Sequence, residues 1–205
     1  MIMTQISVPG VPFALEQSEP WPWQVNESGV AVTAKPTSDL FVDPRGEETG
    51  DSHSAMNAVT LLGTPPDGDF TLTARVRVDF LDTFDAGVLL AWADEAHWAK
   101  LCFEYSPQGQ PMVVSVVTRG VSDDANSSLV DGNVVWLRLS RLGRVLALHS
   151  STDGQTFSFV RVFHLGDAPI RVGFEAQSPT GRGCAVEFTE VSFTSRTLDD
   201  LRDGS

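Results

Sequence analysis

Apolar and polar residues alternate most densely between residues 84 and 124, and this alternation constrains the fold more than any other feature. The segment reads FDAGVLLAW, then HWAKLCFEY, then PMVVSVVTRGVSDD. A period of two is typical of β-strands, in which successive side chains point to opposite faces of a sheet. The connection 106–111 contains two prolines and a glycine, and it predicts a hairpin loop between antiparallel strands.

The same alternation recurs along most of the chain. Together with the runs above, further strands are expected at 13–16, 30–35, 58–63, 70–78, 133–142, 145–150, 156–163, 169–176 and 184–194. About twelve strands joined by short turns, with no convincing amphipathic helix, predict an all-β fold built as an antiparallel two-sheet β-sandwich.

The chain has 205 residues, a length that one β-sandwich domain can account for. We expect this domain to span 13–194. Residues 1–12, which are rich in proline and glycine, are expected to form a flexible lead-in, and the acidic residues 195–205 a frayed or weakly helical tail.

Composition restricts the partners. The chain has 27 acidic and 14 basic residues and a formal net charge of −13. Nucleic acids and anionic membranes attract clustered positive charge, so we expect neither as a partner. No stretch approaches the roughly 20 apolar residues of a membrane span, and the N-terminus lacks a secretory pattern, so we expect a soluble cytoplasmic protein. Cys102 and Cys184 lack metal-ligand spacing and are expected to be free thiols, with no metal or cofactor.

A candidate binding face follows from the alternation of 98–105. One set of side chains, Ala99, Leu101, Phe103 and Tyr105, forms a core face. The other set is Trp98, Lys100, Cys102 and Glu104. Arg119 leaves the core at the end of the next strand, so adjacent strands are expected to bring Lys100, Glu104 and Arg119 onto one surface. The adjoining loop adds Ser122, Asp123, Asp124 and Asn126.

An aromatic platform beside carboxylates, an amide and a guanidinium suits a sugar ring, which stacks through its apolar face and hydrogen-bonds through its hydroxyls. The structural alternative is a salt-bridged, solvated surface, because exposed ion pairs are common and weak. The polar segment from Ser38 to Asn57 is long enough to be either a functional or a disordered loop. His53 within it has no second ligand or nucleophile at a telling spacing, which favours a solvated residue.

In order along the chain, Ser38-Asp39-Leu40-Phe41, Asp85-Ala86-Gly87-Val88-Leu89, Trp98-Ala99-Lys100-Leu101 with Phe103-Glu104, Val116-Val117-Thr118-Arg119 and Ser122-Asp123 resemble a known family. This is the regulation-of-enolase domain family of unknown function, with a concanavalin A-like lectin/glucanase sandwich. The resemblance implies a jelly roll whose concave face bears Lys100, Glu104 and Arg119, and it implies no activity. The chain departs from the pattern at Asp124, where an aromatic is expected, and at Ala91, where an arginine is expected.

The sequence therefore predicts non-catalytic binding of a carbohydrate or polyhydroxylated metabolite on the concave face. The candidate ligand-binding residues are Asp39, Trp98, Lys100, Glu104, Arg119, Ser122 and Asp123. The runner-up is a regulatory domain whose same face receives a protein partner. Glycoside hydrolysis is a weaker alternative, because the Glu-x-Asp-x-x-Glu run of glucanases with this sandwich is absent. No nucleophile motif or phosphate loop is present, so no catalytic residue is assigned.

Overall fold

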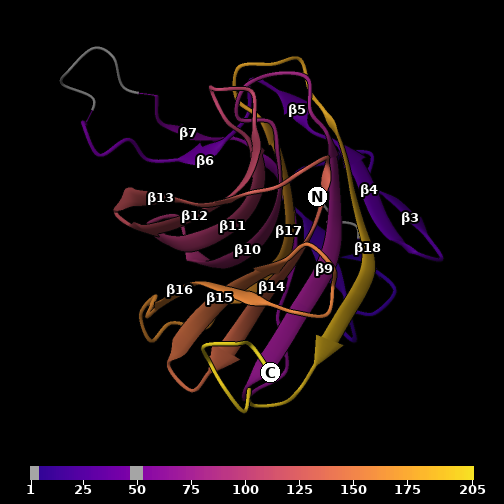
Figure 1. Ribbon diagram of the computed structural model, residues 1–205, viewed down its shortest axis with the longest axis vertical. Coiled ribbons are helices and arrows are strands. Elements are labelled where there is room, and N and C mark those ends of the chain that lie inside the picture. The colour runs from indigo at the N-terminus through magenta and orange to yellow at the C-terminus, as the bar shows by residue number, and fades with distance from the viewer. Residues whose placement is uncertain (1–4, 47–52) are drawn as a thin grey trace.

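Two large sheets packed face to face make up the molecule (Figure 1). The computed structural model describes residues 5–46 and 53–205. Within them every paired strand is antiparallel except the short β5, which runs parallel to β17. The predicted all-β, antiparallel two-sheet sandwich is confirmed.

The first sheet has nine strands and contains the chemically distinctive part of the chain. Its order is β1 (Gln5–Ile6), β2 (Leu15–Gln17), β8 (Val59–Gly63), β17 (Arg171–Ser178), β10 (Ala86–Asp94), β11 (His97–Tyr105), β12 (Pro111–Arg119) and β13 (Val121–Leu129), with β5 (Lys35–Pro36) paired to β17.

The second sheet has seven strands. Its order is β16 (Ser158–Phe163), β15 (Val145–Ser151), β14 (Val134–Leu142), β9 (Phe70–Asp79), β18 (Ala185–Thr194), β4 (Gly29–Thr33) and β3 (Gln24–Asn26). A separate hairpin pairs β6 (Leu40–Phe41) with β7 (Ala55–Met56). All the predicted strands are present to within a few residues, whereas β1, β3, β5, β6, β7 and β13 were not expected.

The main core lies between the two large sheets. The predicted core face of β11 is confirmed, because Ala99, Leu101 and Phe103 are fully buried there. They meet the alternate residues of β9, β14 and β18, such as Leu72 and Val186. Burial of this apolar surface is the main force holding the sheets together.

A second apolar cluster lies on the opposite face of the nine-stranded sheet. In Figure 1 the β6–β7 hairpin lies over β10–β13, on the side away from β14–β16. Leu40 of β6 and Ala58, two residues after β7, pack with Leu90, Trp98 and Cys102 of this face. Both faces of β11 are therefore covered, and we call this second one the hairpin-covered face.

Both ends of the described part of the chain pack on the sandwich. Residues 5 and 6 form β1, which pairs with β2, and Val8 is buried, so the expected loose lead-in is wrong for this part. The C-terminal residues form no helix. They turn back onto the seven-stranded sheet, where Leu198 is buried and the Leu201 carbonyl lies 2.7 Å from Nε2 of His149.

One glycine of β17 marks a close backbone approach. A Cβ at Gly173 would lie 2.1 Å from the carbonyl oxygen of Leu61 on β8. We expect Gly173→Ala to lower the free energy of unfolding by about 3 kcal/mol, because the strands must separate. Gly68→Ala is the control: its positive φ of 99° adds strain, but nothing lies within 4 Å, so about 1 kcal/mol is expected. Urea unfolding measures both, and equal losses would contradict the steric explanation.

Candidate functional site

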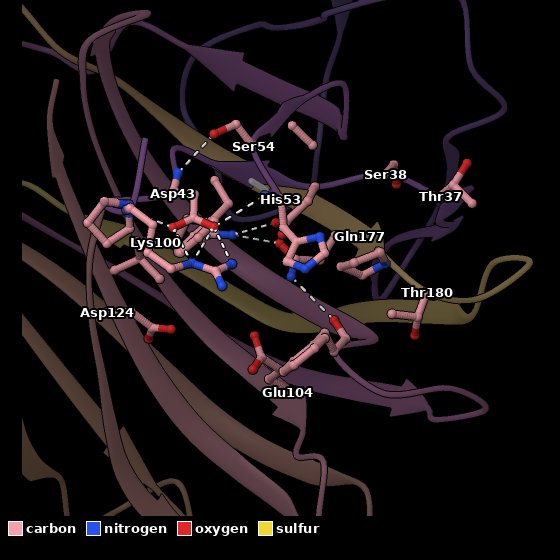
Figure 2. A pocket seen from close by; sticks show the side chains of 18 residues that line it. Thr37, Ser38, Asp43, His53, Ser54, Lys100, Glu104, Asp124, Gln177 and Thr180 are labelled. Atoms are coloured by element: carbon pink, nitrogen blue, oxygen red, sulfur yellow. Dashed lines mark hydrogen bonds and ion pairs between the residues drawn. The ribbon is translucent and has the colours of Figure 1, made fainter. Parts of the chain in front are cut away.

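A cavity of about 700 Å³ lies between the hairpin-covered face and the β6–β7 hairpin. Figure 2 shows Lys100, Glu104 and Asp124 pointing into it from the sheet, with Asp43, His53 and Ser54 on the hairpin side. Its apolar lining is Phe41, Pro44, Ala55, Phe84, Val116 and Pro179. Its polar lining is Thr37, Ser38, Asp39, Asp43, Arg45, His53, Ser54, Lys100, Glu104, Asp124, Gln177 and Thr180.

Backbone hydrogen bonds fix the hairpin to the sheet. Ser38 and Ser178 exchange backbone bonds of 3.2 Å at the β17 side. At the β13 side, the Ser122 N–H donates to the Val42 carbonyl, and the Val42 N–H donates to Ser122 Oγ, both at 2.9 Å. The hairpin thus bridges two strands of the same sheet and forms a roof over the cavity.

Asp43 organises the turn that leads out of β6. Its buried carboxylate accepts the backbone N–H of Arg45 and of His53, and it pairs with the Arg45 guanidinium at 2.6 Å. The hydrogen bond from the Arg45 side chain is the main reason that the pKa of Asp43 lies well below its usual range. Asp43 therefore holds the two described ends of the 43–57 segment together.

Lys100 is buried at the centre of the site. Its side chain is 2% exposed, and Nζ donates to Asp39 Oδ1 at 2.9 Å and to Gln177 Oε1 at 2.7 Å. Burial would lower the pKa of Lys100, but the neighbouring carboxylates of Asp39 and Glu175 outweigh it and raise that pKa. The amine therefore stays protonated, which favours a positioning role over nucleophilic attack.

Three further carboxyl groups surround this ammonium. Burial is the main cause that raises the pKa of Glu104 and that of Glu175, each to about 8. Lys100 opposes the shift in both, whereas the charge of Asp39 adds to it. Asp124 is more exposed, and partial burial with the nearby Asp39 and Asp123 raises its pKa as well. Glu104 and Glu175 are thus largely neutral at neutral pH.

The structure brings together three of the predicted site residues, Asp39, Lys100 and Glu104. Ser122 lies close by, but it is buried and bonded to Thr118 and Val42, so it anchors the hairpin and does not line the cavity. The predicted loop at 122–126 is wrong, because these residues belong to strand β13.

Trp98 is not the exposed platform that the sequence predicts. Its side chain is 0% exposed, stacks on Trp92 at a centroid distance of 6.4 Å, and belongs to the apolar cluster beneath the hairpin. The prediction fails because the hairpin covers this face. Trp98 still approaches the site from within, with Lys100 Nζ 5.8 Å from its ring centroid.

Arg119 and Asp123 point away from the cavity. Arg119 is paired with His97 across β11 and β12, and His97 and Lys100 point to opposite faces of β11. The Arg119 guanidinium donates to the His164 carbonyl at 2.7 Å. Asp123 forms a 2.9 Å ion pair with Arg161 of β16. The predicted shared surface of Lys100, Glu104 and Arg119 is therefore wrong for Arg119, because residues on opposite strand faces cannot meet.

Several cavity residues carried no clear signal in the sequence. Asp124 was predicted beside the face but not among its ligand-binding residues, and neither Gln177 nor the buried Glu175 was predicted to belong to the site. Phe84 and Thr37 have φ values of 69° and 50°. A left-handed backbone at non-glycine residues is uncommon and tends to occur at functional sites, and both residues line this cavity.

Cys102 and Cys184 are free, buried thiols, as the sequence predicts. In the described ranges, no group of three or more His, Cys, Asp or Glu side chains is arranged to hold a metal ion. The same part of the chain contains no helix that is long and apolar enough to cross a membrane.

The chain belongs to the family described as protein of unknown function (DUF1349), whose model matches residues 17–196. This supports the predicted resemblance to a family of unknown function, and no comparison bears on its enolase-related name. A search of curated protein sequences finds no match to the chain.

Solved structures share the fold. A functionally unknown protein from Saccharomyces cerevisiae is 26% identical, with a TM-score of 0.77 over 89% of this chain and 97% of its own. The GH43 protein BlXynB from Bacillus licheniformis is 13% identical with a TM-score of 0.67, over 85% of this chain but only 34% of its own. A legume lectin-like domain from Entamoeba histolytica is 10% identical with a TM-score of 0.58, over 89% of this chain and 90% of its own.

The buried ion pair gives a prediction about stability. Lys100→Met should lower the free energy of unfolding by about 3 to 5 kcal/mol, because it leaves the carboxylate of Asp39 without its cation. Lys35→Met is the matched control, since Lys35 pairs with Glu19 at 2.8 Å on the surface, and its loss should cost under about 1 kcal/mol. Denaturant unfolding of both variants is the measurement. A Lys100→Met loss as small as that of the control would contradict a central structural role.

A second prediction concerns pH. The pKa of Glu175 rises on folding from its ordinary value of 4.5 to about 8. Between these values the unfolded chain has released the proton and the folded chain keeps it, so stability falls as pH rises through this window. Glu175→Gln cannot ionise, so it should remove part of the decline, on the order of 4 kcal/mol for a fully buried group.

The readout is the free energy of unfolding from about pH 4 to about pH 8.5, a span that covers both pKa values. Glu104 contributes to the decline as well, so Glu175→Gln should reduce the slope of stability against pH without removing it. Glu27→Gln, at an exposed turn position, is the control and should run parallel to the parent. Parallel curves for Glu175→Gln and the parent would show that Glu175 is not held neutral.

Proposed function

We propose that the cavity beneath the β6–β7 hairpin binds a saccharide or a similarly polyhydroxylated small molecule without catalysing a reaction. The observation that carries this proposal is the combination of groups in one cavity. The partly exposed rings of Phe41 and Phe84 lie beside carboxyl, amide and hydroxyl groups. A sugar needs such a combination, because its ring has apolar C–H faces and its hydroxyls need directed partners.

Size and available hydrogen-bonding capacity support the proposal. A volume of about 700 Å³ suits a small molecule. Gln177 is already bonded through both ends, to Lys100 and to the Phe84 carbonyl. Among residues 5–46 and 53–205, neither Glu104 nor Asp124 is bonded to another side chain, so their oxygens are acceptors available to ligand hydroxyls.

The folds of the similar proteins are compatible with this proposal but do not carry it. Both the lectin-like domain and the GH43 proteins are under 15% identical, and a shared sandwich leaves the site open. A protein partner on the same face is the alternative. It would need a broad apolar surface with a polar rim, whereas the groups here line a walled cavity.

The test compares two neighbouring aspartates. A thermal-shift screen against mono- and oligosaccharides should find a compound that raises the melting temperature, because a ligand of the folded state stabilises it. Titration calorimetry should then show Asp124→Asn binding roughly tenfold or more weakly, as expected when a charged hydrogen-bond acceptor is lost. Asp123→Asn should bind as the parent does, since Asp123 pairs with Arg161 outside the cavity. Equal losses in the two variants, or silence across the panel, would contradict the proposal.

A further inference from the structure

The two cations of the cavity are already matched to carboxylates. Lys100 Nζ lies 2.9 Å from Asp39, and the Arg45 guanidinium lies 2.6 Å from Asp43. Each pair joins a cation to a carboxylate that also lines the cavity. These four residues therefore contribute little net charge to the space between the hairpin and the sheet.

Glu104 and Asp124 remain as unmatched carboxyl groups. Neither forms an ion pair within residues 5–46 and 53–205. The sequence outside these ranges, 1–4 and 47–52, contains no lysine, arginine or histidine that would supply a side-chain cation. Figure 2 shows both carboxyls on the sheet side of the cavity, directed into it.

A third carboxyl lies beneath the same site. Glu175 is 0% exposed, projects from β17 onto the hairpin-covered face, and has no hydrogen-bond partner on either oxygen in the described chain. Besides burial, the charges of Asp124 and Asp39, and that of Glu175 when it is ionised, disfavour ionisation of Glu104. Lys100 is the cation that opposes them, and its ammonium is already bonded to Asp39 and Gln177. Glu104 therefore has no ion-pair partner of its own among the described residues.

The remaining charged groups near the cavity do not provide an ion-pair partner for Glu104 or Asp124. His53 lies on the hairpin side of the cavity (Figure 2), and the guanidinium of Arg45, which also lines the cavity, donates to Asp43. Asp123, next to Asp124 on β13, adds further negative charge but turns toward Arg161. The whole chain carries a net charge of −13, which attracts cations at long range.

We propose that the bound saccharide carries a protonated amino group, and that this ammonium lies between the carboxyl groups of Glu104 and Asp124. The inference rests on the proposed function and names the class of its ligand, an amino sugar or a similar aminated polyol. The hydroxyls and the sugar ring meet the polar and aromatic lining, and the ammonium supplies the cation that the protein itself lacks there.

This arrangement couples binding to proton release. An ammonium beside Glu104 favours the ionised carboxylate, so binding displaces a proton that burial otherwise retains. Affinity for a ligand that stays cationic therefore rises with pH up to the pKa of about 8 of Glu104. A neutral sugar that accepts a hydrogen bond from the protonated acid shows the opposite trend, because that donor is lost on ionisation.

The experiment compares ligands that share hydroxyl groups and differ in charge. Hexosamines, the parent hexoses, N-acetylhexosamines and hexonates are titrated into the full chain by calorimetry at about pH 6.5, where the amines are charged. N-methylglucamine and glucitol form a second pair, whose amine stays charged to higher pH. Ethylamine serves as a cation without hydroxyls. Repeating the tightest titration in buffers of different ionisation enthalpy measures the protons released.

We expect the amines to bind at least tenfold more tightly than their neutral and acetylated counterparts, with hexonates weakest. Glu104→Gln and Asp124→Asn should each reduce this preference tenfold or more, and Glu104→Gln should also abolish proton release, whereas Asp123→Asn should preserve both. Each variant is first checked for cooperative unfolding, so that loss of folding is not mistaken for loss of binding.

The outcomes separate the two proposals. Equal binding of neutral and aminated sugars would overturn this inference and leave saccharide binding intact. Binding of ethylamine as tight as that of a hexosamine would support the cation site and overturn the recognition of hydroxyls. No binding by any of these compounds would overturn both.

Discussion

The position of the β6–β7 hairpin depends on one buried ion pair. The ammonium of Lys100 on β11 holds Asp39, which immediately precedes β6, and Gln177 at the end of β17. Burying two charges costs several kcal/mol in desolvation, so such a pair contributes more to fixing one arrangement than to net stability. Here it fixes where the roof lies over the sheet. The cavity exists because the hairpin is bonded to the sheet at two points, from Asp39 to Lys100 and from Val42 to Ser122. Between these points it lies over the sheet face.

The same cover explains properties of the site that otherwise look unrelated. It excludes water from Trp98, which therefore becomes a core residue. It also removes Glu104 and Glu175 from bulk solvent and raises the pKa of each. A sheet face with these residues but no hairpin would present ordinary ionised carboxylates to water, because exposed groups titrate near their normal values. The hairpin thus gives this acidic surface carboxyl groups whose pKa values lie above their usual range.

Much of the fold was predictable, because period-two alternation reports which residues face a sheet interior. It gave the correct division of β11 and placed Lys100 and Glu104 together. It failed at β13, since the polar run from Ser122 to Ser128 has no apolar stripe, and strand pairing there depends on backbone bonds to β12. Arg119 was misplaced because a residue that leaves the core at the end of a strand was assumed to lie on the same face as Lys100. Alternation could not predict that Trp98 and Glu175 are buried, because contacts with residues distant in the sequence determine their burial.

A shared fold does not determine which ligand a member of this family binds. One residue shows why different members need not bind the same ligand. The family resemblance implies an aromatic at Asp124, where this chain has a carboxyl group on the cavity wall. An aromatic there would stack on the apolar face of a neutral sugar, whereas a carboxylate cannot stack and instead attracts a cation. The neighbouring Glu104 is partly buried and has no ion-pair partner of its own among the described residues. Under the proposed function, a change at this one position of β13 would shift the same sandwich from neutral to aminated ligands, while the ion pair of Lys100 and the roof above it stay unchanged.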